Sequence, residues 1–348
     1  MFWTGSLESA YNSASMIKMQ MQFSGINNFS PWTYPPQFDL IAALLALAPE
    51  GLAYFIFTTL TFIFYVCILR FLAREYFDIA ILAIAPALFV SIKGGQNGFL
   101  TGALVGLFCL TFIRDRLRAG LPLGFMVIKP HLAVGMAVLA LVNKRWGVLA
   151  MAALVVGLTS LLATVVFGYH IWPAFIGGVG ESAQFLKEGR YPFYRMTSVY
   201  ALCMTFDLSP GHALLIQIIA ALTACCVIYY ACAKGWRSEH MLGIAVLSSL
   251  FISPYIYDYD LPIFGIAIAL LMPSIIANAS QPEKVILLGC SWTACGWGLR
   301  HRFAHDNIWS VSGICLLVIY FMVLRIVSAA ERSRTKEIPP LADEPAIQ

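Results

Sequence analysis

Long apolar runs separated by short polar clusters make up most of this chain. The intervals without Asp, Glu, Lys or Arg are 51–69, 79–92, 94–113, 119–128, 130–143, 146–180, 208–233, 240–257, 261–282, 285–299 and 307–324. A spanning helix needs about 20 apolar residues, and a charge at mid-bilayer costs about 2.5–3.5 kcal/mol, so the longer intervals are candidate spans. The shorter ones predict tilted, broken or re-entrant helices. We expect an all-α, polytopic helical bundle with about 8–10 membrane segments.

Basic side chains gather in five clusters, and short cytoplasmic loops of membrane proteins carry an excess of Lys and Arg. The clusters are Arg70 with Arg74; Arg114, Arg116 and Arg118; Lys144 with Arg145; Lys234 with Arg237; and Arg325, Arg332, Arg334 and Lys336. Placing all five inside gives a consistent alternation of spans. The stretch 119–143 then begins and ends inside. It predicts a helical hairpin that bends near Pro130, because proline breaks a helix.

The same alternation places the other connections outside: residues 1–37, the turn around Lys93, the loop 169–196, the segment 253–260 and residues 300–306. We expect an outer loop over 1–37 and a membrane domain over 38–329 that carries the outer loop 169–196. The polar, proline-containing residues 330–348 predict a disordered cytoplasmic tail.

Composition narrows the class of protein. Charged residues make up 11% of the chain and AVILMFWYC residues 60%, which excludes a soluble enzyme, since soluble domains are about 25% charged. The net charge of +4 is spread over short clusters, so no nucleic-acid groove is expected. The nine cysteines show no repeated C-x-x-C pairing and are typical of small apolar side chains. We expect no metal site.

The first polar segment is KGGQNG, residues 93–98, between two apolar runs. Its glycines allow the backbone to approach a ligand closely, and Lys93, Gln96 and Asn97 offer donors suited to phosphate or sugar hydroxyls. The alternative is a tight interhelical turn whose lysine reaches the membrane surface.

The second segment is Lys129-Pro130-His131, at the predicted bend of the hairpin. A lysine this far from other charges along the chain must face a cavity, a headgroup or a counter-ion. We interpret Lys129 as a phosphate contact, with His131 as a hydrogen-bond donor beside it. The alternative is a structural ion pair with Asp258 or Asp260.

The third segment is SPYIYDYD, residues 253–260. Tyr257, Asp258 and Asp260 are suited to acid–base chemistry, metal binding or contacts with sugar hydroxyls. The alternative is an aromatic belt at the membrane interface with a solvated acidic turn.

Two outer segments carry further candidates. Trp32 and Tyr34 precede Pro35-Pro36 and an apolar run, which predicts a short re-entrant helix with aromatic rings at its start. Tyr34 is suited to stacking on a sugar or to the interface. The loop 169–196 has an amphipathic pattern and ends in RYPFYR with Arg195, a further candidate phosphate contact; the alternative is a solvated loop.

The order of these segments resembles glycosyltransferase family 87, bacterial polytopic enzymes of the GT-C type. The residues that carry the resemblance are YPP with the run that follows it (34–49), GGQNGFLTGALVGL (94–107), KPHLAVGMAVLALVNKRW (129–146), MTSVYAL (196–202) and SPYIYDYDL (253–261). The resemblance implies transfer of a sugar, typically mannose or arabinofuranose, from a polyprenyl-phosphate donor to a lipid or glycan acceptor. It further implies the bacterial cytoplasmic membrane, with the active site facing outside.

In GT-C enzymes an aspartate of the first outer loop acts as base. Phe2-Trp3-Thr4-Gly5 resembles the stretch that follows this acidic residue, which would place the base upstream of Met1. Glu8 and Asp39 are the nearest substitutes. For a reaction of this kind, our hypothesis is that Lys129 stabilises the leaving phosphate, together with Lys93 or Arg195. No nucleotide enters the site, and a divalent cation is compatible with the reaction but not required.

Two other functions stay open from the sequence. Intramembrane lysine and broken helices also suit a transporter or flippase of lipid-linked sugars. An inactive relative that binds lipid-linked sugar without transferring it is the third interpretation. Polar residues gathered on the outer side favour the enzyme.

Overall fold

The computed structural model describes residues 6–25, 29–114, 116–299 and 309–337. These residues are almost entirely helical, and a single antiparallel bridge between Met196 and Tyr257 is found among them. The α-helices are α1 Ser13–Ser24, α2 Pro36–Leu45, α3 Glu50–Ala73, α4 Phe77–Gly94, α5 Gly98–Ile113, α6 Gly120–Phe125, α7 Pro130–Val142, α8 Trp146–Phe167, α9 Ile171–Lys187, α10 Val199–Thr205, α11 Pro210–Ala233, α12 Ser238–Ser249, α13 Pro262–Asn278, α14 Gln281–Gly296 and α15 Val311–Glu337. Short 3₁₀ turns that matter below are η2 Leu7–Tyr11, η5 Met126–Ile128, η6 Phe193–Arg195 and η7 Asp258–Asp260.

Four segments of the described chain are long and apolar enough to cross a membrane: Glu50–Gly94, Trp146–Phe167, Pro210–Ala233 and Val311–Thr335. The first of them contains both α3 and α4. Shorter apolar helices, among them α2, α5, α7 and α13, complete the bundle. The all-α, polytopic membrane fold expected from the sequence is confirmed.

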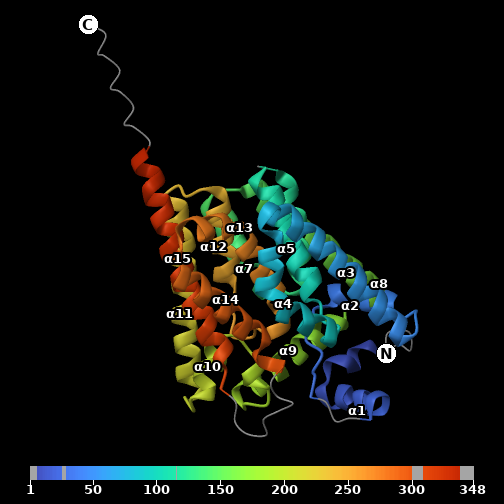
Figure 1. Ribbon diagram of the computed structural model, residues 1–348. Coiled ribbons are helices and arrows are strands. Elements are labelled where there is room, and N and C mark those ends of the chain that lie inside the picture. The colour runs from blue at the N-terminus through green and yellow to red at the C-terminus, as the bar shows by residue number, and fades with distance from the viewer. Residues whose placement is uncertain (1–5, 26–28, 115, 300–308, 338–348) are drawn as a thin grey trace.

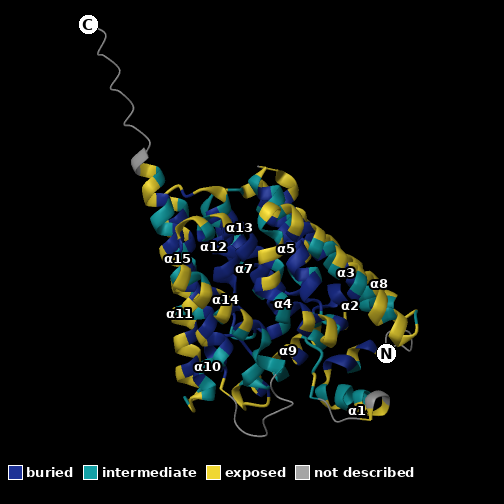
Figure 2. Cartoon of the chain, in the orientation of Figure 1, coloured by how far each residue is buried: buried dark blue, intermediate teal, exposed yellow. Residues whose placement is uncertain are grey.

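Helix α13 forms the centre of the bundle. Every residue from Pro262 to Met272 is buried, so this helix is apolar on all sides and packs against α4, α5, α12 and α15. The peripheral helices α3, α8 and α11 instead expose large apolar side chains such as Phe55, Leu158 and Leu222. Figure 2 shows exposed residues, in yellow, along the outer helices α3, α8 and α11. A bilayer is the environment in which such a surface is stable.

The helix ends and turns that carry the basic clusters lie at one end of the bundle, the upper end in Figure 1. The last turns of α3, which carry Arg70, pack against Gly106 of α5. The Arg145 guanidinium lies 5.4 Å from the centre of the Phe112 ring at the end of α5, and Asn143 donates to Cys232 Sγ at 3.2 Å. Arg334 donates to the Gly235 carbonyl at 2.7 Å, which joins α15 to the turn between α11 and α12. Helices α1, α9 and α10 lie at the opposite, lower end (Figure 1).

The predicted hairpin over 119–143 is present. Helix α6 and turn η5 lead to Lys129, and Pro130 then occupies the first turn of α7, where its missing N–H costs no hydrogen bond. Pro36 likewise begins α2, the short helix expected after Trp32 and Tyr34.

Three predicted segments contain more helix than expected. The expected loop 1–37 contains η2 and α1, and the loop 169–196 contains the amphipathic helix α9. The predicted tail begins too early, because α15 continues to Glu337. Side-chain contacts of Glu331 with α12 hold these last turns. The motif Phe2–Gly5, the connection 300–306 and the tail after Glu337 lie outside the described residues.

Candidate functional site

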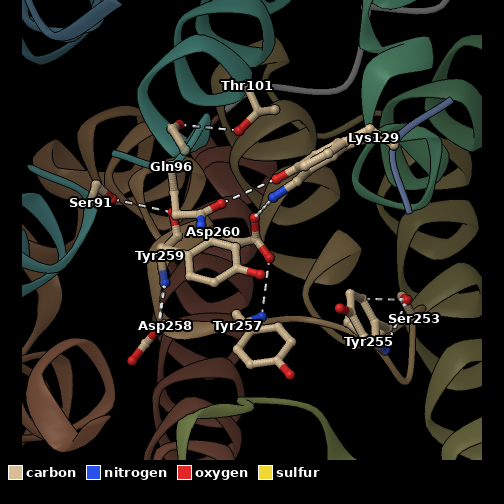
Figure 3. A network of polar contacts seen from close by, with 12 residues as sticks. Ser91, Gln96, Thr101, Lys129, Ser253, Tyr255, Tyr257, Asp258, Tyr259 and Asp260 are labelled. Atoms are coloured by element: carbon tan, nitrogen blue, oxygen red, sulfur yellow. Dashed lines mark hydrogen bonds and ion pairs between the residues drawn. The ribbon is translucent and has the colours of Figure 1, made fainter. Parts of the chain in front are cut away.

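The SPYIYDYD segment forms a tight turn at the lower end of the bundle, between α4, α5 and α14. Ser91 of α4 donates to the carbonyl oxygen of Tyr259 at 3.2 Å. A Cβ on Gly98 would lie 1.9 Å from the same oxygen, so only glycine fits at the start of α5. Figure 3 shows the result: Asp260 points toward Lys129, and Asp258 points away from it.

Asp260 faces the hairpin and forms an ion pair with Lys129. Both side chains are buried, with Lys129 6% and Asp260 1% exposed. The second Asp260 oxygen accepts from the Tyr257 N–H at 3.0 Å, and the Lys129 ammonium lies 4.7 Å from the centre of the Tyr259 ring. The structural pairing considered as an alternative for Lys129 is therefore present, and it neutralises the charge of this lysine.

Asp258 faces the other way and accepts two hydrogen bonds from Arg195. The Nε–Oδ2 distance is 3.0 Å and the Nη2–Oδ1 distance is 2.9 Å, a bidentate arrangement. Asp258 is 1% exposed, whereas the Arg195 side chain is 34% exposed. Burial raises the pKa of Asp258 above its ordinary value, and the charge of Arg195 opposes that rise.

A cavity of about 430 Å³ lies beside this second pair. Its lining comprises Val90, Lys93, Gly94, Tyr194, Arg195, Asp258, Gly298 and Leu299. A Cβ on Gly298 would lie 2.0 Å from Asp258 Oδ2, so only glycine leaves room at this position for the Asp258–Arg195 pair. The volume falls within the range of small-molecule sites, which is about 300–1,000 Å³.

Tyr34 lies on the hairpin side of the turn. Its hydroxyl donates to Gln96 Oε1 at 3.1 Å, and the Lys129 ammonium lies 5.7 Å from its ring centre. Both amide atoms of the buried Asn97, and Nε2 of His131, have no hydrogen-bond partner among the described residues. The His131 ring packs edge-on against Tyr255, with centroids 6.5 Å apart.

The predicted site residues thus divide into two groups around one turn. Lys93, Arg195 and Asp258 meet at the cavity, and Tyr257 lies beside Arg195, whose guanidinium is 6.0 Å from its ring centre. Tyr34, Gln96, Lys129 and Asp260 form a connected network on the other side.

The two proposed substitutes for the base lie elsewhere. Glu8 is exposed on η2 and is not among the cavity residues. Asp39 is 0% exposed in the first turn of α2, where its two oxygens lie within hydrogen-bond distance of Tyr11 Oη and Trp32 Nε1. Helix α2 has 10 residues and is too short to span a bilayer. Burial raises the pKa of Asp39 to about 7.

Sequence reasoning missed two features. Gly298 and Tyr194 line the cavity, but a single glycine or tyrosine carries no signal without the fold. At the opposite end, His240 contacts Glu331 through Nδ1 and Ser274 Oγ through Nε2, the latter at 2.7 Å. These three residues are far apart in the sequence.

Within the described ranges, no group of three or more His, Cys, Asp or Glu side chains is arranged to hold a metal ion.

A family model for glycosyltransferase family 87 matches residues 32–254, more than half of the chain. The chain belongs to glycosyltransferase family 87. The resemblance seen in the sequence motifs is confirmed, and the family together with the long apolar helices identifies a membrane glycosyltransferase. The matched range of this family 87 protein includes Tyr34, Lys93, Lys129 and Arg195, and ends shortly before Asp258. No curated protein and no solved structure matches the chain.

Proposed function

We propose that this family 87 enzyme takes its sugar from a polyprenyl-phosphate donor and transfers it to a lipid or glycan acceptor. The observation that carries the proposal is the cavity in which Lys93 and Arg195 meet. A phosphodiester has one negative charge, and charge-assisted hydrogen bonds from Lys and Arg are the strongest that a side chain offers to it.

The two cations differ in what they contribute. Lys93 is exposed and forms no ion pair among the described residues, so its charge is available to a ligand. Arg195 is held by Asp258 through Nε and one Nη2 donor, which fixes its orientation. Its other N–H donors form no hydrogen bond with the described residues. Together they form an anion-binding contact in which the Lys93 side chain can adapt to the ligand and the Arg195 side chain is held rigidly by Asp258.

The reaction would be a direct displacement. A bond forms between the acceptor oxygen and the anomeric carbon, and the bond from that carbon to the phosphate oxygen breaks. The electron pair leaves with the polyprenyl phosphate, whose growing charge Lys93 and Arg195 stabilise. The proton of the acceptor hydroxyl passes to a carboxylate base.

We assign Lys129 a different role from the one expected at first. Its ammonium is buried against Asp260 and two tyrosine rings, and removing it from that pair to contact a phosphate would leave Asp260 unpaired. Lys129 therefore orients the turn η7, and the cavity on the other side of the turn takes the phosphate.

The distribution of basic residues supports a site outside the cytoplasmic membrane. The basic clusters share the upper end of the bundle in Figure 1. The cavity is instead lined by Lys93 and Gly94 at the end of α4 and by Arg195 of η6, which precedes α10 at the lower end. Since cytoplasmic loops carry the excess of Lys and Arg, the upper end is the cytoplasmic one.

Lys93→Ala tests the proposal with little risk to the fold, because this side chain is exposed. Loss of one charge-assisted contact predicts a decrease in transfer of about 10- to 100-fold. The assay uses a synthetic polyprenyl-phosphate mannose and acceptors from source membranes. Lys187→Ala is the control, because it removes the same charge from an exposed lysine at the end of α9.

Equal rates for Lys93→Ala and Lys187→Ala would contradict the phosphate site. A wild-type protein that moves the intact donor across vesicle membranes without cleaving it would contradict the transferase and support the flippase alternative.

A further inference from the structure

Asp39 is a fully buried carboxylate that no basic side chain contacts in the described part of the chain. Tyr11 Oη lies 2.6 Å from Asp39 Oδ2, and Trp32 Nε1 donates to Oδ1 at 2.9 Å. A substrate hydroxyl cannot reach these oxygens without displacing one of the two aromatic partners. The burial of Asp39 therefore argues against a base and in favour of a structural contact that serves the site.

The Tyr11 hydroxyl has one proton and lies near two acceptors. Besides Asp39, it lies 2.9 Å from the carbonyl oxygen of Tyr34. All partners are satisfied when Asp39 carries a proton: the acid donates to Tyr11 Oη, and Tyr11 donates to the Tyr34 carbonyl. An uncharged acid also avoids the cost of burying an unpaired carboxylate.

Both partners of Asp39 contact Tyr34. The Trp32 ring packs edge-on against the Tyr34 ring with centroids 5.0 Å apart, and Tyr11 holds the Tyr34 backbone. Tyr11 is itself fixed by packing against α9, where its ring lies 5.8 Å from that of Phe175. Asp39 thus connects an anchored tyrosine and a tryptophan to the segment that carries Tyr34.

Tyr34 connects this segment to the site through contacts of its side chain. Its hydroxyl donates to Gln96 in the KGGQNG turn, which also contains Lys93, and its ring covers the ammonium of Lys129. The KGGQNG turn and Lys129 both contact η7, and Lys93 of that turn lines the cavity described above.

We propose that Asp39 is a positioning residue that, as a protonated acid, holds Tyr34 against Gln96 and Lys129 and so sets the geometry of the donor site. This inference rests on the proposed function. Asparagine reproduces the arrangement, since its amide N–H₂ donates to Tyr11 and its carbonyl accepts from Trp32.

The test measures kcat and KM for a synthetic polyprenyl-phosphate mannose with the full chain in proteoliposomes. Asp39→Asn is expected to keep kcat/KM within about 3-fold of wild type, whereas Asp39→Ala and Tyr34→Phe each raise the donor KM by about 10-fold. The double variant Asp39→Ala with Tyr34→Phe is expected to equal the worse single variant, because both changes remove the same contact. If Asp39→Ala does not accumulate in membranes, Tyr11→Phe replaces it in the cycle, because this change removes one hydroxyl only.

Two results would overturn the inference while transfer by the wild type stands. Loss of kcat in Asp39→Asn with an unchanged donor KM would make Asp39 the base. Additive losses in the double variant would show a contribution to the fold that does not act through Tyr34. Failure of the proposed function has a different signature: the wild type would neither transfer mannose nor bind farnesyl phosphate in calorimetry, and the inference would fall with it.

Discussion

Gly298, two residues after the end of α14, lies directly against the Asp258–Arg195 pair. A methyl group at this position would lie 2.0 Å from Asp258 Oδ2 and 3.3 Å from Arg195 Cγ. Gly298→Ala therefore forces the bidentate pair to move and narrows the cavity, and we expect transfer to decrease by at least about 10-fold, the effect of losing one charge-assisted contact.

Gly289→Ala is the matched control, because a Cβ at this position of α14 has open space around it. Both variants are compared by initial rate of mannose transfer and by melting temperature in detergent. Equal rates would mean that the Asp258–Arg195 geometry does not matter for transfer.

At the scale of single residues, the sequence indicates which residue types occur near one another along the chain, but not which of them form ion pairs in the fold. The Lys129–Asp260 pair was one of two alternatives, and the two aspartates stand two residues apart on one turn. Lys129 and Asp260 are separated by 131 positions, so only the packing of the hairpin against η7 decides between them. The same holds for Gly298, whose role exists only because α14 lies against the turn.

Among the elements, α15 is tied to α12 by a buried polar cluster at the upper end of the bundle. Glu331 is 3% exposed and contacts the His240 ring, the Arg237 N–H and the Arg334 guanidinium. Glu331→Ala leaves these donors without their shared acceptor, and we expect a loss of about 3 kcal/mol in the free energy of unfolding.

The measurement is thermal unfolding in detergent followed by tryptophan fluorescence. Glu239→Gln, one residue before His240, is the control for removing an acidic charge from α12. A melting temperature of Glu331→Ala equal to that of the control would show that the cluster does not stabilise the fold.

Helix boundaries were predictable where proline sets them. Pro130 and Pro36 begin α7 and α2 as expected, because proline is excluded from a helix interior but fits its first turn. The end of α15 was not predictable, since residues after 330 are polar and their helix is stabilised by long-range contacts, those of Glu331 with α12 and of Arg334 with the Gly235 carbonyl. Local composition cannot report such a contact.

At the scale of the whole molecule, the basic clusters and the cavity lie apart. Contacts such as Arg145 over Phe112 and Arg334 to Gly235 bring distant basic clusters to one end, and the cavity with Lys93 and Arg195 lies at the other. Under the proposed function, the polyprenyl chain of the donor would lie in the bilayer and its phosphate at the membrane surface, within reach of a site at one end of the bundle.

The most direct test is a cryo-EM structure of the protein with a phosphonate analogue of a polyprenyl-phosphate mannose, which resists cleavage. We expect phosphonate oxygens within hydrogen-bond distance, about 3 Å, of Lys93 Nζ and of the Arg195 guanidinium, with the Lys129–Asp260 pair intact. A phosphonate bound to Lys129 or His131, with Lys93 and Arg195 facing solvent, would contradict the central claim.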